Sequence, residues 1–363
     1  MRLLELEIHA FRVLREVRLV LAPGLNLIVG PNASGKTSVL EAVHVLARGR
    51  SFRTPSLEEA VRCGEPGFVV RGHVESAGGR RWVALGRRSG ETEVRVGAQR
   101  GRSAAVLAVH LRVWAVHAGT VALVEGGPGE RRQLVDWGVF HVEPGYLDLW
   151  RRYRRALRQY NALLRRRARE AELRPWGRTL AAAGEALEGL RSRWLPSWER
   201  ALAEALEALG PLPAVRVGYQ RGWSRGARLA EALAAAEETE RALGFCRTGP
   251  HAMDLRLTVE GRSAKRVLSR GQQKLLALAM ALAAMRVAAG HGRLAVLLVD
   301  DLAAELDVER RARAAELLAA TGAQVLATAV EAGAFPTDAW AEACLFHVEQ
   351  GAVAPGERDA PMI

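Results

Sequence analysis

A glycine-rich stretch of eight residues carries the strongest chemical signal in the sequence. It reads GPNASGKT, follows the short apolar run Leu25–Gly30 and precedes a helix-like segment that ends at Gly49. This pattern and context are typical of a phosphate-binding loop, in which glycines let backbone N–H groups turn towards phosphate oxygens. The lysine reaches the β- and γ-phosphates, and the threonine hydroxyl binds Mg²⁺. The predicted ATP-binding residues are Gly30, Pro31, Asn32, Ala33, Ser34, Gly35, Lys36 and Thr37.

A second apolar run ends in two carboxylates. The segment Arg293–Asp301 ends in LLVDD, and its length and composition indicate a buried strand. A strand end beside a phosphate-binding loop is where a Mg²⁺-binding acid belongs, so we assign Asp300 to the Mg²⁺ shell together with Thr37. Asp301 would orient or deprotonate the attacking water, which makes Asp301 and Lys36 the predicted catalytic residues. The alternative is a strand that runs into an acidic turn.

The start of a third segment, SRGQQ, has two explanations. It precedes an apolar, alanine-rich helix, and Ser269 could be an ordinary N-cap of that helix. Alternatively, Ser269 and Gly271 would expose backbone donors to a phosphate, and Gln272 and Gln273 would add side-chain donors. Because the phosphate-binding loop already covers its own nucleotide, such a second device would serve the nucleotide of another subunit. The residues alone leave both explanations open.

Strand-like segments stand on both sides of a long helical stretch. Apolar residues follow helical spacing over 146–173, and Pro175 and Gly177 are expected to break this helix. Further helices are expected at about 180–209 and 228–243. A helical module is therefore inserted in an α/β domain. The expected strands of that domain lie within residues 1–20, 25–30, 66–124, 253–261, 293–301 and 323–330.

The charge balance points to an anionic partner. The chain has 363 residues and a formal net charge of +12, which favours a nucleic acid over a cationic ligand. Residues 151–174 hold ten arginines against Glu170 and Glu172, and we expect a DNA phosphate-binding face there. The alternative is a solvated helix face in an arginine-biased chain. Trp150, Tyr153 and Tyr160 share the apolar stripe and are expected in the core rather than as base-stacking residues. The candidate DNA-binding residues are Arg151, Arg152, Arg154, Arg155, Arg158 and Arg165.

Several other classes of protein are disfavoured. The three cysteines, Cys63, Cys246 and Cys344, are isolated, so neither a disulfide framework nor a zinc site is expected. Charged residues interrupt the apolar stretches before the roughly 18 residues of a membrane span, and the N-terminus reads as strands rather than a signal peptide. We therefore expect a cytoplasmic protein.

Several segments together resemble a known family. The run LSRGQQ is similar to the signature motif of ABC-type ATPases, and with the phosphate-binding loop and LLVDDLAAELD it resembles the head of the SMC-like ATPases. Further segments in the same order, among them GGPGERRQLVDWGVFH and TGPHAMDL, resemble the RecF family of bacterial DNA repair. The resemblance covers nearly the whole chain. It implies an α/β, P-loop ABC-type ATPase head (1–130 and 248–363) with an inserted helical arm or lid domain (131–247).

The resemblance also implies a function. The chain would use ATP and Mg²⁺, dimerise on ATP, and bind single-stranded and duplex DNA at gaps without sequence preference. It would be a slow, DNA-stimulated ATPase that acts as a switch in DNA replication and repair, working with RecR to direct the loading of RecA. The implied positions are Ser269, Arg270, Gly271 and Gln272 for a signature that acts in trans, and Glu305 and Asp307 for the D-loop.

Three positions depart from the pattern of the family. Ala118-Gly119 stands where the family usually has Pro-Glu, and no Mg²⁺-sensing glutamine is found nearby. Ala252 replaces an arginine in the GPH motif, and Ala304 replaces a serine. We expect these replacements to weaken either ATP coupling or a DNA contact.

Two other functions are considered. The ATP-binding subunit of an ABC transporter would share the three motifs, but the long insertion between them and the basic charge argue against it. A DNA-binding scaffold without hydrolysis would not need the complete set of Lys36, Thr37, Asp300 and Asp301. The three departures keep the scaffold open as an alternative.

Overall fold

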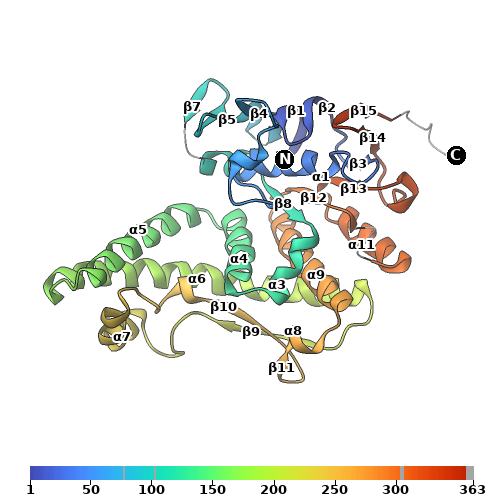
Figure 1. Cartoon of the computed structure of the whole chain (residues 1–363). Helices are drawn as coiled ribbons and strands as arrows, with labels where there is room; N and C mark the ends of the chain where they lie inside the picture. Colours follow the sequence, from blue (N-terminus) through green and yellow to red (C-terminus); the bar gives the residue numbers. More distant parts are fainter. Residues whose placement is uncertain (77, 102–103, 303–305, 357–363) are drawn as a thin grey trace. The chain divides into compact units, whose positions relative to one another are not determined.

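The structure, a computed structural model, describes residues 1–76, 78–101, 104–302 and 306–356 (Figure 1). The chain forms two compact units. The first unit comprises Met1–Thr120, Ala208–Gly210 and Ala288–Ile363, and the second unit comprises Val121–Glu207 and Pro211–Val287.

This division differs from the expected domain boundaries, most of all at the second one. We expected residues 248–287 in the head, whereas the structure groups them with the second unit. Strand β10 (Asp254–Val259) pairs along its whole length with β9 (Val215–Gln220). In addition, Trp198 Nε1 donates a hydrogen bond to the Met280 carbonyl at 3.1 Å. The signature residues and the phosphate-binding loop therefore belong to different units.

A mostly parallel six-stranded sheet of the first unit carries the predicted chemistry. Its strand order is β15-β14-β3-β13-β12-β8, and only β15 is antiparallel to its neighbour. All residues of β3, β12 and β13 are buried, as is usual for parallel strands covered on both faces. The strands are β3 (Leu25–Val29), β8 (Val113–Val116), β12 (Val296–Val299), β13 (Gln324–Ala329), β14 (Ala343–Glu349) and β15 (Ala352–Pro355).

A second six-stranded sheet of the first unit is antiparallel throughout. Its order is β2-β1-β4-β5-β6-β7. The run of strands expected over 66–124 is thus shared between two sheets, because β8 belongs to the parallel one. The strands are β1 (Arg2–Phe11), β2 (Leu14–Val20), β4 (Gly67–Ser76), β5 (Gly79–Arg88), β6 (Glu91–Val96) and β7 (Gln99–Gly101).

Helix α1 (Lys36–Arg48) lies between these two sheets (Figure 1). It contacts β1 and β4 on one side and β8 and β13 on the other. Val43 of α1, Leu6 of β1 and Leu326 of β13 are fully buried members of one apolar core. Gly49 ends the helix in a left-handed conformation with φ 66°, as predicted. Helices α2 (Leu107–His110) and α11 (Val308–Ala320) also belong to this unit.

The second unit contains the long helices, and one of them begins earlier than predicted. Helix α5 (Tyr146–Arg165) ends at a short break in which Arg167 has φ 53°. Helix α6 (Glu170–Leu209) then runs through Pro175 and Gly177. The predicted break at these two residues is therefore wrong. Pro175 lies early in α6, where proline removes one hydrogen bond, and buried apolar side chains on both sides of it stabilise the helix.

A small antiparallel sheet, β11-β10-β9, completes the second unit. The sequence analysis predicted β10 and did not predict β9. The remaining elements are α3 (Ala122–Glu125), α4 (Pro128–Val142), α7 (Leu229–Leu243), β11 (Arg262–Ser263), α8 (Ala264–Val267) and α9 (Arg270–Gly290).

Helix α9 is an exception to the expectation that no apolar stretch is long enough to span a membrane. Among the described residues it is the one helix that is long and apolar enough to cross a membrane by length and composition. Of its most apolar 18-residue window, 78% is buried inside the structure. This degree of burial is typical of a core helix, which is apolar all round for packing reasons.

Candidate nucleotide site

The ends of four parallel strands bring the predicted catalytic groups together. Strands β3, β13, β12 and β8 are neighbours in this order, so their carboxyl ends share one edge of the sheet. The phosphate-binding loop follows β3, Asp300 and Asp301 follow β12, and Thr328 lies near the end of β13 between them. Ligands of parallel α/β sheets bind at this edge. The site predicted from the sequence is thus assembled within the first unit.

The backbone of the phosphate-binding loop requires its glycines. Gly30 has φ 155° and Gly35 has φ 120°. A Cβ at Gly30 would lie 2.2 Å from the Val348 carbonyl oxygen, so no other residue fits there. Helix α1 begins directly after Gly35, and in the described part of the chain no side-chain hydrogen bond caps it. Its first N–H groups are therefore available to an anion.

Lys36 closes over the loop that precedes it. Its side chain is 7% exposed, and Nζ donates to the carbonyls of Gly30 at 2.7 Å and Pro31 at 2.8 Å. Burial lowers the pKa of the Lys36 ammonium, while the charges of Asp301 and Asp300 oppose that shift. The lysine is thus held at the mouth of the loop with two carboxylates close enough to influence it.

A threonine that the sequence analysis missed links the carboxylate of Asp300 to the backbone of Asp301. Thr37 Oγ1 donates to Asp300 at 2.9 Å, and the fully buried Thr328 donates to the same carboxylate at 2.8 Å. The Asp301 backbone N–H donates to Thr328 Oγ1 at 2.9 Å. The hydroxyl of Thr37 and the carboxylate of Asp300 are hard oxygen donors, a set that fits Mg²⁺. Asp301 has φ 51°, a conformation that non-glycine residues keep mainly at functional sites.

A pocket of about 460 Å³ opens at this edge and includes two further arginines. Arg12 and Arg53 line it and form ion pairs with Glu41, at 2.8 Å and 3.2 Å. The Glu41 side chain is fully buried inside α1. A carboxylate within the apolar segment SVLEAVHVLA needs cationic partners when it is buried. This isolated glutamate in an apolar helix was the sequence feature from which such partners could have been predicted. Val13 and Val61 add apolar surface to the same pocket.

His117 follows β8 at the same edge, where the sequence analysis found no Mg²⁺-sensing glutamine. The Asp300 N–H donates to the carbonyl of Val116 at 2.8 Å, which joins the two strand ends. His117 Nδ1 accepts from the Gly119 N–H at 3.1 Å, so the neutral ring carries its proton on Nε2. Burial lowers the pKa of His117, opposed by the charge of Asp300. A neutral imidazole with its proton on Nε2 is therefore placed close enough to Asp300 to be influenced by its charge.

The signature residues open helix α9 in the second unit. Ser269 Oγ accepts from the Gln272 N–H at 3.3 Å, and Gln272 Oε1 accepts from the Ser269 N–H at 2.9 Å. This reciprocal pair is a capping box, so Ser269 is an N-cap, as the first of the two explanations held. Ser269, Arg270 and Gly271 are nevertheless exposed, and Arg270 lies 3.8 Å from Glu125. The expectation is wrong for Gln273, which is buried and whose amide donates to the carbonyls of Lys265 and Leu268. The cap does not prevent a phosphate contact by the other residues, so the second explanation stays a prediction.

The predicted D-loop is described only in part. Asp307 is the N-cap of α11, with Oδ1 accepting from the Arg310 N–H at 2.9 Å. Glu305 and the departing residue Ala304 lie outside the described residues.

The arginine-rich face lies on α5. Each of its six candidate arginines is exposed, and the Arg154 guanidinium lies over the Trp150 ring at 5.2 Å. Tyr153 and Tyr160 are buried, each 2% exposed, which confirms their expected place in the core. The expectation is wrong for Trp150, which is half-buried with Arg154 over its ring. A face of exposed arginines whose two tyrosines are buried suits phosphates better than bases.

Comparison with protein families matches residues 2–352 to the RecF/RecN/SMC N terminal domain. The DNA replication and repair protein RecF of Edwardsiella ictaluri (strain 93-146) is 39% identical over 357 residues, which cover 98% of this chain and 100% of that protein. The protein of the same name from Chromohalobacter salexigens is 41% identical over 338 residues, covering 91% and 92%.

Solved structures agree with these relatives. The recombination mediator protein RecF-ATPrS in the RecFOR pathway is 25% identical, with a TM-score of 0.83 over 98% of both chains. An Smc head bound to the C-winged helix domain of ScpA has a TM-score of 0.63 at 13% identity and shares the fold. The expected α/β, ABC-type ATPase fold is therefore confirmed.

Proposed function

Because the chain belongs to the RecF family of DNA replication and repair proteins, within the SMC-like ATPases, we propose that it is an ATP-dependent, DNA-binding recombination mediator. It dimerises on ATP and works with RecR to direct the loading of RecA at single-strand gaps, in the cytoplasm. The observation that carries the proposal is the cluster of Lys36, Thr37, Asp300, Asp301 and Thr328 at one sheet edge.

The residues of this cluster have different roles in binding and hydrolysing ATP. Backbone N–H groups of the loop and of the first turn of α1 bind the phosphates, and Lys36 leaves the carbonyls of Gly30 and Pro31 to contact them. Thr37 and Asp300 would hold Mg²⁺, which neutralises phosphate charge when bound. Thr328 fixes the carboxylate of Asp300 and the backbone of Asp301 together. Asp301 is then positioned to orient or deprotonate water.

The second unit completes the site of a partner subunit. Ser269, Arg270, Gly271 and Gln272 are exposed or half-buried at the start of a helix, where the helix dipole favours an anion. They would contact the γ-phosphate held by the other protomer, followed by the D-loop residues Glu305 and Asp307. Closure of the dimer thus depends on ATP, and slow hydrolysis reverses it.

DNA binding is assigned to the exposed arginines of α5. Contacts to phosphates alone give sequence-independent binding whose affinity falls steeply with salt. The wide spread of these arginines over one helix face suits both a duplex and a single strand at a gap. The transporter alternative is set aside because the relatives at 39% and 41% identity are DNA replication and repair proteins.

Sedimentation and ATPase assays test the proposal directly. We expect a monomer without nucleotide, a dimer with ATP, and ATP hydrolysis that DNA stimulates. A protein that stays monomeric with ATP and whose hydrolysis ignores DNA would contradict it. An ATP-dependent dimer without any hydrolysis would instead favour the scaffold alternative.

A further inference from the structure

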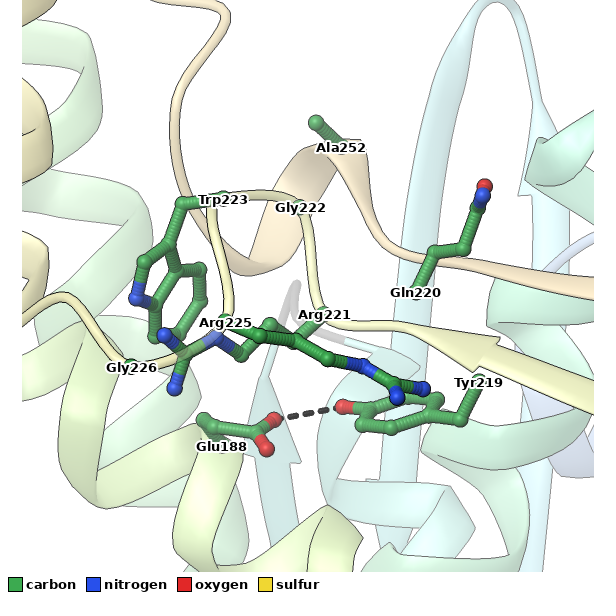
Figure 2. Close-up of a pocket in the computed structure, with 9 residues that line it drawn as sticks. All are labelled: Glu188, Tyr219, Gln220, Arg221, Gly222, Trp223, Arg225, Gly226 and Ala252. Atoms are coloured by element: carbon green, nitrogen blue, oxygen red, sulfur yellow. Dashed lines mark hydrogen bonds between the residues drawn. The ribbon is translucent and has the colours of Figure 1, made fainter.

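A polar pocket of about 720 Å³ lies wholly within the second unit (Figure 2). One wall is the loop that follows β9, and another is the turn η4 (Pro250–Ala252). Pockets of about 300–1,000 Å³ are typical of sites for small organic ligands. The pocket is therefore large enough for one nucleotide.

Buried polar groups hold the turn that forms one wall. The Arg191 guanidinium, 3% exposed, donates to the Pro250 carbonyl at 2.8 Å and pairs with Asp136 at 2.5 Å. His251 Nδ1 shares a hydrogen bond of 2.5 Å with the buried Tyr153 hydroxyl. Buried polar networks of this kind are stabilising only when satisfied, and they fix one geometry. The turn is thus rigid, while Ala252 at its end is exposed at the pocket.

The facing loop presents an immobilised aromatic ring. The Arg221 guanidinium lies over the Trp223 ring, 4.4 Å from its centroid, and donates to the Ser224 and Ala227 carbonyls. Trp223 Nε1 donates to the same Ala227 carbonyl at 3.2 Å. The indole is therefore fixed before any ligand binds, and Trp223, which is half-buried, is one of the residues that line the pocket (Figure 2). A fixed aromatic plane is the usual platform for an unpaired base.

The charge of the pocket favours an anion. Arg225 is exposed and has no ion-pair partner in the part of the chain that the structure describes. The acidic side chain among the lining residues, Glu188, is already occupied: it accepts from the Tyr219 and Ser192 hydroxyls, both at 2.5 Å. Among the lining residues the two arginines, Arg221 and Arg225, outnumber the one carboxylate, so the pocket wall carries net positive charge and suits a phosphate.

The exposed face of the small sheet leads to the pocket. Arg216, Gly218 and Gln220 alternate along one face of β9, and Arg256 of β10 pairs with Gly218. Arg216 and Arg256 are exposed and carry no ion pair among the residues described, and Gln220 lines the pocket. The opposite face of β10 is buried in the core. A cationic strip therefore runs along the sheet to the pocket.

We propose that this pocket holds one nucleotide of a single DNA strand. The base stacks against Trp223, and Arg225 binds the adjacent phosphate. Arg256 and Arg216 bind phosphates further along the DNA strand. The inference rests on the proposed DNA-binding function and adds a site for unpaired bases to the phosphate face of α5.

The test uses the full-length protein with ATP and a fluorescent oligothymidylate, read by anisotropy. Trp223→Ala is expected to weaken binding roughly 5- to 150-fold, the range for one lost base–aromatic stack. Trp223→Tyr keeps an aromatic ring and should retain most of the affinity. Arg225→Glu should weaken binding and reduce its salt dependence, whereas Arg200→Glu, the same charge change at an exposed position on α6, should do neither.

Binding of duplex DNA and competition by free nucleotide are the two remaining measurements. A paired base cannot enter the pocket, so duplex binding and ATP-dependent dimerisation should be unchanged in Trp223→Ala. If the wild type binds DNA and Trp223→Ala binds the oligomer equally well, the pocket assignment is overturned while the proposed function stands. If the wild type binds no DNA, the proposed function itself fails, and the pocket inference with it. Displacement of the oligomer by an equal concentration of thymidine monophosphate would contradict the proposal that the ligand is a DNA strand and would indicate a mononucleotide instead.

Discussion

Helices α1 and α9 both begin with glycine and small polar residues, but their first turns are built differently. Helix α1 begins after Gly35 without a side-chain cap among the described residues, at the edge where Lys36 and two carboxylates lie. The start of α9 is satisfied by its own capping box, formed by Ser269 and Gln272. An uncapped start is ready for an anion, whereas a capped one must first exchange its own hydrogen bonds. This difference supports the proposal that the first site binds ATP within one chain and that the start of α9 contacts a nucleotide presented by a partner.

The substitution with the largest expected effect removes the predicted catalytic carboxylate of the first site. Asp301→Asn removes the base and should lower ATP hydrolysis by roughly 10²- to 10⁴-fold, because the amide cannot take a proton from water. ATP affinity and ATP-dependent dimerisation should persist, as measured by nucleotide binding and sedimentation. Asp338→Asn is the matched control, since Asp338 is exposed in a turn of the first unit and has no proposed role in the site. Full hydrolysis by Asp301→Asn would remove Asp301 from the catalytic role.

Lys36→Met tests whether the first site binds phosphate through its lysine. Hydrogen bonds to charged groups contribute about 1.5–3 kcal/mol, so we expect the ATP dissociation constant to rise roughly 10- to 150-fold. Equilibrium binding of a fluorescent ATP analogue to the monomer measures this. Lys274→Met, in the first turns of α9, should leave monomer binding unchanged. Equal losses in both variants would mean that the two helix starts do not differ in the way proposed.

Ser269→Arg tests whether the start of α9 is needed for dimerisation but not for ATP binding by the monomer. A long side chain at the exposed N-cap should block the partner's nucleotide, so ATP-dependent dimerisation should weaken at least about 10-fold, a change of about 1.4 kcal/mol. ATP binding by the monomer should stay normal. Ser269→Thr keeps the hydroxyl and the cap and should dimerise like the wild type. Sedimentation at several concentrations gives the constants, and normal dimerisation of Ser269→Arg would refute the assignment in trans.

The smallest expected effect concerns stability alone. Gln272→Ala removes half of the capping box and should lower the free energy of unfolding by roughly 0.3–1.5 kcal/mol. Ser34→Ala, before α1, should cause no such loss, because the buried Ser34 hydroxyl has no hydrogen-bond partner in the described structure. Urea denaturation of both variants measures the difference. A larger loss from Ser34→Ala would show that α1 depends on a cap of its own.

Much of the fold and of the site followed from the sequence. The spacing of GPNASGKT, the strand before it and Gly49 after it predicted the loop and the bounds of α1. The acidic pair after an apolar run located Asp300 and Asp301. These features are local, because each depends on residues that are contiguous in the chain.

Other features depend on tertiary contacts and were missed or misplaced. Proline and glycine propensities predicted a break at Pro175 and Gly177, but burial of the flanking side chains overrode them. Nothing near Thr328 in the sequence indicates that it hydrogen-bonds to Asp300. The domain boundary moved because β9 pairs with β10. The sequence of β9, VRVGYQ, has the alternation typical of a strand, but nothing local indicates which strand it pairs with.

The sequence by itself determined which groups could bind phosphate, since backbone donors and the residues that expose them are neighbours along the chain. Tertiary structure alone decided how these groups are used. It placed Thr328 between two strand ends and satisfied Glu41 with Arg12 and Arg53. It also brought Trp223 and Ala252 to one pocket. The physical reason is that burial and pairing depend on residues far apart in the chain, whose proximity exists only after folding.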